Sequence, residues 1–113
     1  AAVSPQVLVN VTNDAWFVGT ETPELHARLA AMRSIELRRD MVRAVNHGVS
    51  GWIDAYGRVR LRRDDPEPGY ALVEPQLRDA PPTFYARFGD LPMWLCLLVA
   101  SGACVLDRRR RAA

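Results

Sequence analysis

The sequence lacks lysine altogether, so all 15 of its basic residues are arginine. It has only two cysteines, Cys96 and Cys104, and both lie inside one apolar run near the C-terminus. A reaction that needs a catalytic lysine, or a cysteine exposed on a folded domain, cannot be completed by these 113 residues alone. The first residue is Ala1 rather than Met, which we interpret as a sign that the chain is a piece of a longer protein.

Motifs that hold metals, cofactors or phosphates are also missing. His26 and His47 are the two histidines, and their spacing matches no metal-ligand motif. The sequence contains no glycine-rich phosphate loop and no nucleophile elbow. We therefore expect neither a metal nor a cofactor.

The excess of basic charge belongs to the tail, where Asp107 is followed by four consecutive arginines at residues 108–111. Five arginines in the middle of the chain could form a basic face, but acidic residues interleave with them: Arg38, Arg39, Arg60, Arg62 and Arg63 among Glu36, Asp40, Asp64 and Asp65. A nucleic-acid-binding face gathers its arginines together with aromatic residues. The pattern instead predicts a solvated surface of mixed charge and no nucleic-acid partner.

Residues 91–106 form an uncharged apolar run, which as a helix would be about 24 Å long. A membrane's hydrocarbon core is about 30 Å thick, so the run is short for a spanning helix. The arginine tail, however, resembles a cytoplasmic flank, and Trp94 resembles an interfacial aromatic residue. We expect a transmembrane helix at residues 89–107 and a cytoplasmic tail at 108–113, with residues 1–90 outside the cytoplasm. The alternative is a buried core helix of a soluble domain.

The remaining residues read as alternating strands and a helix, typical of an α/β layered fold. Strands are predicted at residues 6–11, 41–45, 49–53, 58–61 and 70–73, and residues 75–82 form a linker. Thr22 and Pro23 predict the start of a helix that ends near residue 39, with the threonine hydroxyl as N-cap. The helix should bury the apolar residues that recur at helical spacing: Leu25, Leu29, Met32, and Ile35 or Glu36.

One polar and aromatic cluster stands out at the end of the first predicted strand. Asn13, Asp14, Trp16 and Phe17 lie where α/β proteins bind ligands, although a turn stapled by its aromatic residues would use the same residue types. Asn46 follows another strand and could be a turn residue alone. Glu36 and Arg33 indicate a structural ion pair more than a catalytic group.

These segments, taken in order, resemble apolipoprotein N-acyltransferases of the nitrilase, or carbon–nitrogen hydrolase, superfamily. The resemblance covers nearly the whole chain. Its blocks are residues 9–17, His26, residues 32–33, 35–37, 42–44, 46–50 and 53–57, and residues 82–90 before the last helix. The family usually has Gly directly after the Trp-Phe pair, whereas Val18 stands there in this sequence.

The resemblance implies a membrane-bound enzyme of the bacterial inner membrane. Its periplasmic domain transfers an acyl chain from a phospholipid to the N-terminal cysteine of an apolipoprotein. A Glu, a Lys and a Cys perform the transfer through a thioester. In the family all three precede the Asn-Asp-Ala-Trp-Phe block, so no catalytic residue carries over. Asn13, Asp14, Trp16 and Phe17 carry over as substrate-binding residues, and His26, Glu36 and Asn46 carry over as supporting residues.

We therefore expect residues 1–88 to form the C-terminal part of a nitrilase-type α-β-β-α sandwich, followed by one transmembrane helix. The partners implied are a phospholipid acyl donor, an apolipoprotein acceptor and a membrane. We expect the 113-residue chain to be inactive by itself. Two alternatives stay open: a membrane-anchored interaction module without catalysis, and another nitrilase-type amidase.

Overall fold

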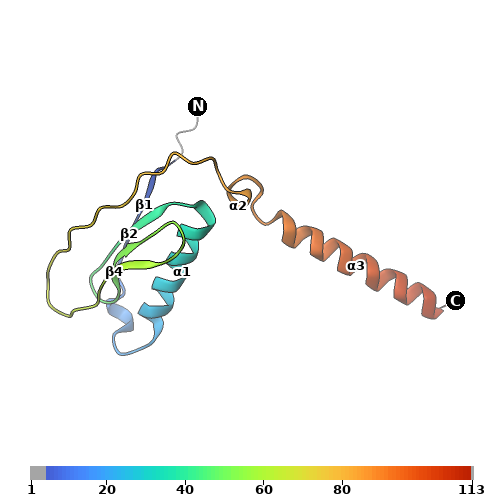
Figure 1. The fold of residues 1–113 in the computed structure, drawn as a ribbon. Helices are drawn as coiled ribbons and strands as arrows, with labels where there is room; N and C mark the ends of the chain where they lie inside the picture. The colour runs from blue at the N-terminus through green and yellow to red at the C-terminus, as the bar shows by residue number, and fades with distance from the viewer. Residues whose placement is uncertain (1–4, 113) are drawn as a thin grey trace. The chain divides into compact units, whose positions relative to one another are not determined.

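The computed structural model describes residues 5–112, apart from the side chains of residues 109, 110 and 112. Its elements follow the chain in this order (Figure 1): β1 (Val7–Thr12), the short 3-10 helix η1 (Ala15–Phe17), α1 (Thr22–Leu37), β2 (Asp40–Val45), β3 (Ser50–Ile53), β4 (Val59–Arg63), α2 (Phe84–Phe88) and α3 (Leu91–Ala112). The chain divides into two compact units, Ala1–Thr83 and Phe84–Ala113.

The first unit is a mixed four-stranded sheet with α1 packed beside it (Figure 1). The strand order is β1-β2-β3-β4, with β1 parallel to β2 and the other two neighbours antiparallel. Parallel strands need a crossover connection, which α1 supplies. The parallel pairing brings the carboxyl ends of β1 and β2 to one edge of the sheet, with Thr12 opposite Val45. The prediction of an α/β fold is confirmed at this level.

Helix α1 buries a different face from the one predicted. Its buried residues are Ala27, Ala30 and Ser34, whereas the large apolar residues of the predicted inner face are exposed: Leu25, Leu29, Met32 and Ile35. The prediction was wrong because it ranked faces by hydrophobicity. Small side chains let the helix approach the sheet closely, and the core there consists of Ala30 with Met41 and Ile53.

Both ends of α1 also differ from the standard caps. Glu21, rather than Thr22, is the N-cap residue, and its side chain accepts no capping hydrogen bond. The hydroxyl of Thr20 instead accepts from the backbone N–H of Thr22 at 3.3 Å and donates to the Phe17 carbonyl at 2.7 Å. At the C-terminal end Arg38 adopts a left-handed conformation, with φ of 52°, at a position that glycine usually fills.

Two predicted features are corrected after α1. Residues 70–73 form no strand, and the Tyr70 carbonyl accepts a hydrogen bond from the Arg63 guanidinium at 3.0 Å. Arg39 and Asp40 belong to the interior, not to a solvated surface of mixed charge. Arg39 donates to the carbonyls of Pro5 and Ala80, at 2.6 and 2.8 Å. A single buried guanidinium thereby fixes two distant segments of the unit.

The turn between β3 and β4 lies against the C-terminal half of α1. The Asp54 carboxylate accepts from the backbone N–H groups of Tyr56 and Arg58, at 2.9 and 3.0 Å. Gly57 has φ of +78°, and a Cβ there would lie 2.6 Å from the Ile35 side chain. Only glycine meets both demands, so the predicted glycine turn is confirmed and its position against the helix is explained.

The second unit contains α2 and α3. The predicted apolar helix is present in α3, and Leu91–Arg108 is long and apolar enough to cross a membrane, by length and composition. This segment has no buried residues within the described part of the chain. Cys96 and Cys104 are free and exposed along it.

Candidate functional site

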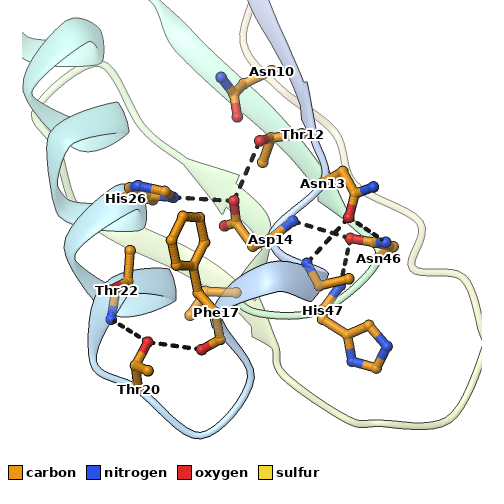
Figure 2. Close-up of polar contacts among 12 residues, drawn as sticks. Asn10, Thr12, Asn13, Asp14, Phe17, Thr20, Thr22, His26, Asn46 and His47 are labelled. Carbon is orange, nitrogen blue, oxygen red and sulfur yellow. Dashed lines mark hydrogen bonds and ion pairs between the residues drawn. The ribbon is translucent and has the colours of Figure 1, made fainter.

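Asp14 is the centre of the polar cluster at the carboxyl end of β1 (Figure 2). Its side chain is 1% exposed, and its two oxygens contact two different side chains, the His26 imidazole and the Arg43 guanidinium. Oδ1 lies 3.0 Å from His26 Nδ1, and Oδ2 accepts from the Arg43 guanidinium at 3.0 Å. The hydroxyl of Thr12 also donates to Oδ1 at 3.3 Å. The contacts orient the His26 imidazole from α1 toward the strand end.

Asn13 and Asn46 join the two strand ends directly (Figure 2). The Asn46 amide donates to Asn13 Oδ1 at 2.7 Å, and Asn46 Oδ1 accepts from the Asp14 backbone N–H at 3.1 Å. Asn13 Oδ1 also accepts from the Ala15 N–H, at 3.1 Å, which starts the short helix η1. The carboxyl ends of the parallel strands β1 and β2 thus bring together residues 33 positions apart, a contact that the sequence analysis did not predict.

Gly48 allows the turn after β2 to approach this cluster. It has φ of +125°, and a Cβ there would lie 3.0 Å from Pro23 Cβ and 3.6 Å from Asp14 Oδ2. A larger residue would therefore crowd Pro23 at the start of α1 and would strain the backbone, whereas its contact with the buried carboxylate would be an ordinary one.

The two aromatic residues of the motif have different environments. The Phe17 ring meets the His26 imidazole edge to face, with centroids 5.5 Å apart, as Figure 2 shows. Trp16 is 84% exposed and makes no hydrogen bond or ring contact within the described residues 5–112. An indole this exposed contributes little to folding and is available to contact a ligand.

Glu36 lies apart from the cluster, near the other end of α1. Its carboxylate pairs with Arg33 at 2.7 Å, which is the structural ion pair that the sequence indicated. Its backbone carbonyl accepts a hydrogen bond from the Thr83 hydroxyl. Glu36 therefore fixes the end of the helix and the segment that leaves the first unit.

Arg43 belongs to the site but was not singled out from the sequence. It is 4% exposed, and besides Asp14 it donates to Asn10 Oδ1 and to the Val49 carbonyl, the latter at 3.1 Å. The signal that could have found it is a single charged residue inside the apolar strand at residues 41–45. A charge in such a strand requires a buried partner of opposite sign, and Asp14 is that partner.

A second buried carboxylate, Asp40, anchors the extended segment after β4. It accepts from the Trp52 indole at 2.9 Å and from the backbone N–H groups of Ala55 and Gln76, both at 3.0 Å. Burial alone raises the pKa of Asp40, but the bonds from Gln76, Trp52 and Ala55 outweigh it. The pKa of Asp40 therefore lies below its ordinary value. The carboxylate stays ionised and structural.

A cavity of about 630 Å³ opens between the middle strands and the segment after β4. Val42, Ala44 and Val73 line it together with Asn46 and His47. Of the site residues predicted from the sequence, Asn46 alone lines this cavity, together with Arg43 and Gly48, which the structure adds to the site. Within the described residues, no group of three or more metal-ligating side chains occurs.

The arrangement contains groups that can bind a ligand, but it is not a complete reaction centre. It provides an oriented imidazole, a buried Asp–Arg pair and an exposed indole, all on one edge of the sheet. It provides neither a lysine nor a cysteine in the first unit. A nucleophilic reaction at this edge would need groups from outside these 113 residues.

No family model matches the chain. The chain is 43% identical to a protein named Apolipoprotein N-acyltransferase 2 from Leptospira interrogans, over 87% of its own length and 17% of the relative's. It is 41% identical to the Apolipoprotein N-acyltransferase of Methylococcus capsulatus, over 94% and 21%, and 34% identical to that of Geobacter metallireducens, over 95% and 20%. The chain thus spans roughly a fifth of the length of the curated relatives it matches.

Proposed function

The chain is homologous to the apolipoprotein N-acyltransferases over most of its own length, and we propose that it forms part of a membrane-bound enzyme of that activity. The observation that carries the proposal is the homology across the strand-end cluster and the apolar helix together. The proposed enzyme takes an acyl chain from a phospholipid and transfers it to the N-terminal cysteine amine of an apolipoprotein.

The proposed reaction proceeds through a thioester. A cysteine thiolate attacks the ester carbonyl of the phospholipid, and the lysophospholipid leaves as an alcohol whose oxygen takes a proton from the catalytic glutamic acid. The amine of the acceptor then attacks the thioester carbonyl, the glutamate takes a proton from the amine nitrogen, and the thiolate leaves. The Glu, Lys and Cys for these steps are contributed by residues outside this chain, because the sequence has no lysine and its cysteines belong to the apolar helix.

The chain's own contribution is the wall and frame of the site. We assign substrate contact to Trp16 and Phe17, with Asn13 and Asp14 beside them at the end of β1. His26 and Asn46 support these residues through the bonds to Asp14 and Asn13. The exposed indole of Trp16 suits an acyl chain, since it offers a large apolar surface without a partner in the fold.

Glu36 has a supporting role at a different place. It acts through Arg33 and through the Thr83 hydroxyl, and so it maintains the end of α1 rather than the substrate-binding edge.

The proposed architecture is part of a nitrilase-type α-β-β-α sandwich at residues 1–88. A transmembrane helix at 89–107 and a basic tail at 108–113 follow. Residues 1–90 lie in the periplasm and the tail in the cytoplasm of a bacterial inner membrane. Four arginines directly after the apolar helix support this orientation, because such clusters remain on the cytoplasmic side.

A chimeric enzyme tests the proposal. This chain replaces the matching segment of the Methylococcus capsulatus relative, which shares 41% identity with it over 109 residues. Purified chimera is assayed with a phospholipid donor and a peptide acceptor beginning with cysteine. We expect acyl transfer by the chimera and none by the 113-residue chain. Transfer by the chain alone, or a well-folded chimera without activity, would contradict the proposal.

Substitutions in the active chimera separate substrate binding from folding. Trp16→Ala should reduce transfer at least tenfold and leave thermal stability nearly unchanged, because Trp16 is 84% exposed and little of its surface is buried by the fold. Val18→Ala is the matched control, since it truncates another exposed apolar residue of the same loop. Equal activity in the two variants would refute the assignment of Trp16. Amide hydrolysis without a lipid donor would instead favour a nitrilase-type amidase.

A further inference from the structure

Three arginines converge on one exposed aromatic ring near the C-terminal end of α1, whereas the strand-end cluster lies near its N-terminal end. The guanidinium carbons of Arg38, Arg58 and Arg78 lie 5.4, 5.7 and 5.6 Å from the ring centroid of Tyr56. Arg38, Arg58 and Tyr56 are exposed, and Arg78 is half-buried. This group, the Tyr56 arginine cluster, gathers positive charge around an aromatic platform.

The cluster is only partly neutralised by its surroundings. Asp40 lies 3.4 Å from Arg78, and the Asp54 carboxylate pairs with Arg60 and with backbone N–H groups of the turn. Arg38 and Arg58 form no ion pair with a carboxylate in the described part of the chain. Two exposed guanidiniums therefore retain their capacity for bidentate hydrogen bonds to an anion.

The backbone holds the cluster in place at some cost. Arg38 occupies a left-handed position where glycine is the favoured residue. The tight approach of Gly57 to Ile35 fixes the Tyr56 turn beside the helix end that carries Arg38. Two independent devices thus converge on one arrangement of side chains.

The chain leaves the first unit next to this cluster. Thr83 donates to the carbonyl of Glu36, two residues before Arg38, and the candidate membrane span begins at Leu91. Only seven residues separate Thr83 from that span along the chain. A connection of this length leaves the first unit within reach of the surface of any membrane that α3 crosses.

We propose that the Tyr56 arginine cluster binds the phosphate headgroups of anionic phospholipids and holds the first unit against the membrane surface. Guanidiniums match phosphate oxygens in geometry and charge, and the tyrosine ring suits the interfacial region. The proposal needs the membrane span but not the acyltransferase activity. It identifies a lipid contact separate from the acyl-chain contact assigned to Trp16.

The test uses the full 113-residue chain in lipid nanodiscs. One set of discs contains phosphatidylcholine alone, and the other also contains phosphatidylglycerol. A lipid with a gadolinium chelate on its headgroup relaxes nearby nuclei, and NMR reports the relaxation of the Tyr56 and Gly57 amides. We expect stronger relaxation in the anionic discs, and its loss at about 1 M salt, where the Debye length is about 3 Å.

Two double variants with equal loss of charge decide the role of the cluster. Arg38→Gly with Arg58→Gln removes the unpaired guanidiniums, and glycine suits the backbone at residue 38. It should weaken docking about thirtyfold, because each arginine near an anionic surface contributes about 1 kcal/mol. Arg28→Gln with Arg62→Gln is the control, since both arginines are exposed and pair with Glu24 outside the cluster. The control should dock like the parent.

Several results would overturn the proposal. Equal relaxation of the Tyr56 and Gly57 amides in the two kinds of disc would exclude recognition of anionic lipid. An equal loss of docking in the Arg28/Arg62 control would mean that only the net charge of the chain attracts it to the membrane. Binding of inorganic phosphate at Tyr56 that abolishes the effect of phosphatidylglycerol would identify a soluble anion site instead. Failure of the chain to enter discs would refute both span and lipid contact. If the NMR spectrum shows that the cluster variant misfolds, the salt dependence of the parent decides the question. Relaxation that persists at high salt would then contradict the proposal.

Discussion

At the scale of single residues, the first unit depends on two buried carboxylates with different partners. Asp14 neutralises Arg43 and orients His26. Asp40 accepts hydrogen bonds from the Trp52 indole and from backbone N–H groups. A buried charge is tolerated only when paired and hydrogen-bonded, so removing one partner costs more than the pair contributes. Both residues therefore lend themselves to tests by conservative substitution.

Asp14→Asn should strongly destabilise the first unit. The amide keeps the shape of the side chain but leaves the Arg43 guanidinium buried without a counter-ion. The loss should be about 3–5 kcal/mol of unfolding free energy, measured by denaturant titration of the full chain in detergent. Glu24→Gln is the control, because it breaks exposed pairs with Arg28 and Arg62 and should cost about 1 kcal/mol or less. A similar cost for both variants would contradict the structural role of Asp14.

The stability of the first unit should fall in acid through Asp40. Burial raises the pKa of Asp40, but its hydrogen bonds outweigh this effect and hold it below the ordinary value of 3.8. A depressed pKa in the folded state stabilises the protein at high pH, and this contribution is lost as pH falls below about 4. Asp40→Asn should therefore flatten the decline in thermal midpoint between about pH 5 and pH 3. An unchanged decline would exclude Asp40 as its source.

At the scale of elements, α1 is packed by its small residues and exposes its large ones. Ala27, Ala30 and Ser34 face the sheet, and Leu29 and Met32 face away. A helix with an apolar face on each side is typical of a layer buried between two others. The exposed face of α1 is consistent with a chain that spans roughly a fifth of its relatives.

A pair of substitutions on neighbouring positions tests this orientation of α1. Ala30→Leu should destabilise the first unit by about 1–3 kcal/mol, because the buried alanine leaves no room against Met41 and Ile53. Leu29→Gln should change unfolding free energy by about 0.5 kcal/mol or less, because Leu29 is exposed. Denaturant titration of both variants gives the comparison. The opposite ranking would mean that the helix presents its large residues to the sheet.

At the scale of the whole molecule, the apolar helix α3 determines whether the chain is more stable in water or in a membrane. Every residue with a described side chain in α3 is exposed, and the window Leu91–Arg108 passes for a membrane span by length and composition. An exposed apolar helix of this length is unfavourable in water and favourable in lipid.

A charge at the centre of α3 should impair membrane insertion more than one near its end. Val99→Arg places a cation mid-helix, where it should cost about 2.5–3.5 kcal/mol of insertion free energy. Val105→Arg is the matched control, because its side chain can extend toward the polar flank beside the arginine tail. Insertion efficiency is read by glycosylation mapping in microsomes. Equal insertion of both variants would argue against a spanning helix.

The sequence by itself determined the elements and much of the strand-end cluster. The local pattern located the paired strands and the two long helices, and it placed Asn13, Asp14 and Asn46 at strand ends. The folded chain then brings these three residues together, because parallel strands carry the residues that follow them to one edge of the sheet. His26 and Phe17 joined the cluster because α1 begins at that edge.

Only the tertiary structure decided which face of α1 is buried and which charges are interior. The sequence pattern assigned Arg39 and Asp40 to the surface, although both are buried, and it gave no role to Arg43. It also grouped Glu36 with the supporting residues of the site, although Glu36 pairs with Arg33 apart from the cluster. Burial depends on shape complementarity and on partners far along the chain, such as Ala80 for Arg39 and Gln76 for Asp40. Local pattern cannot encode those contacts, because a charge is buried only where the folded chain supplies its hydrogen bonds.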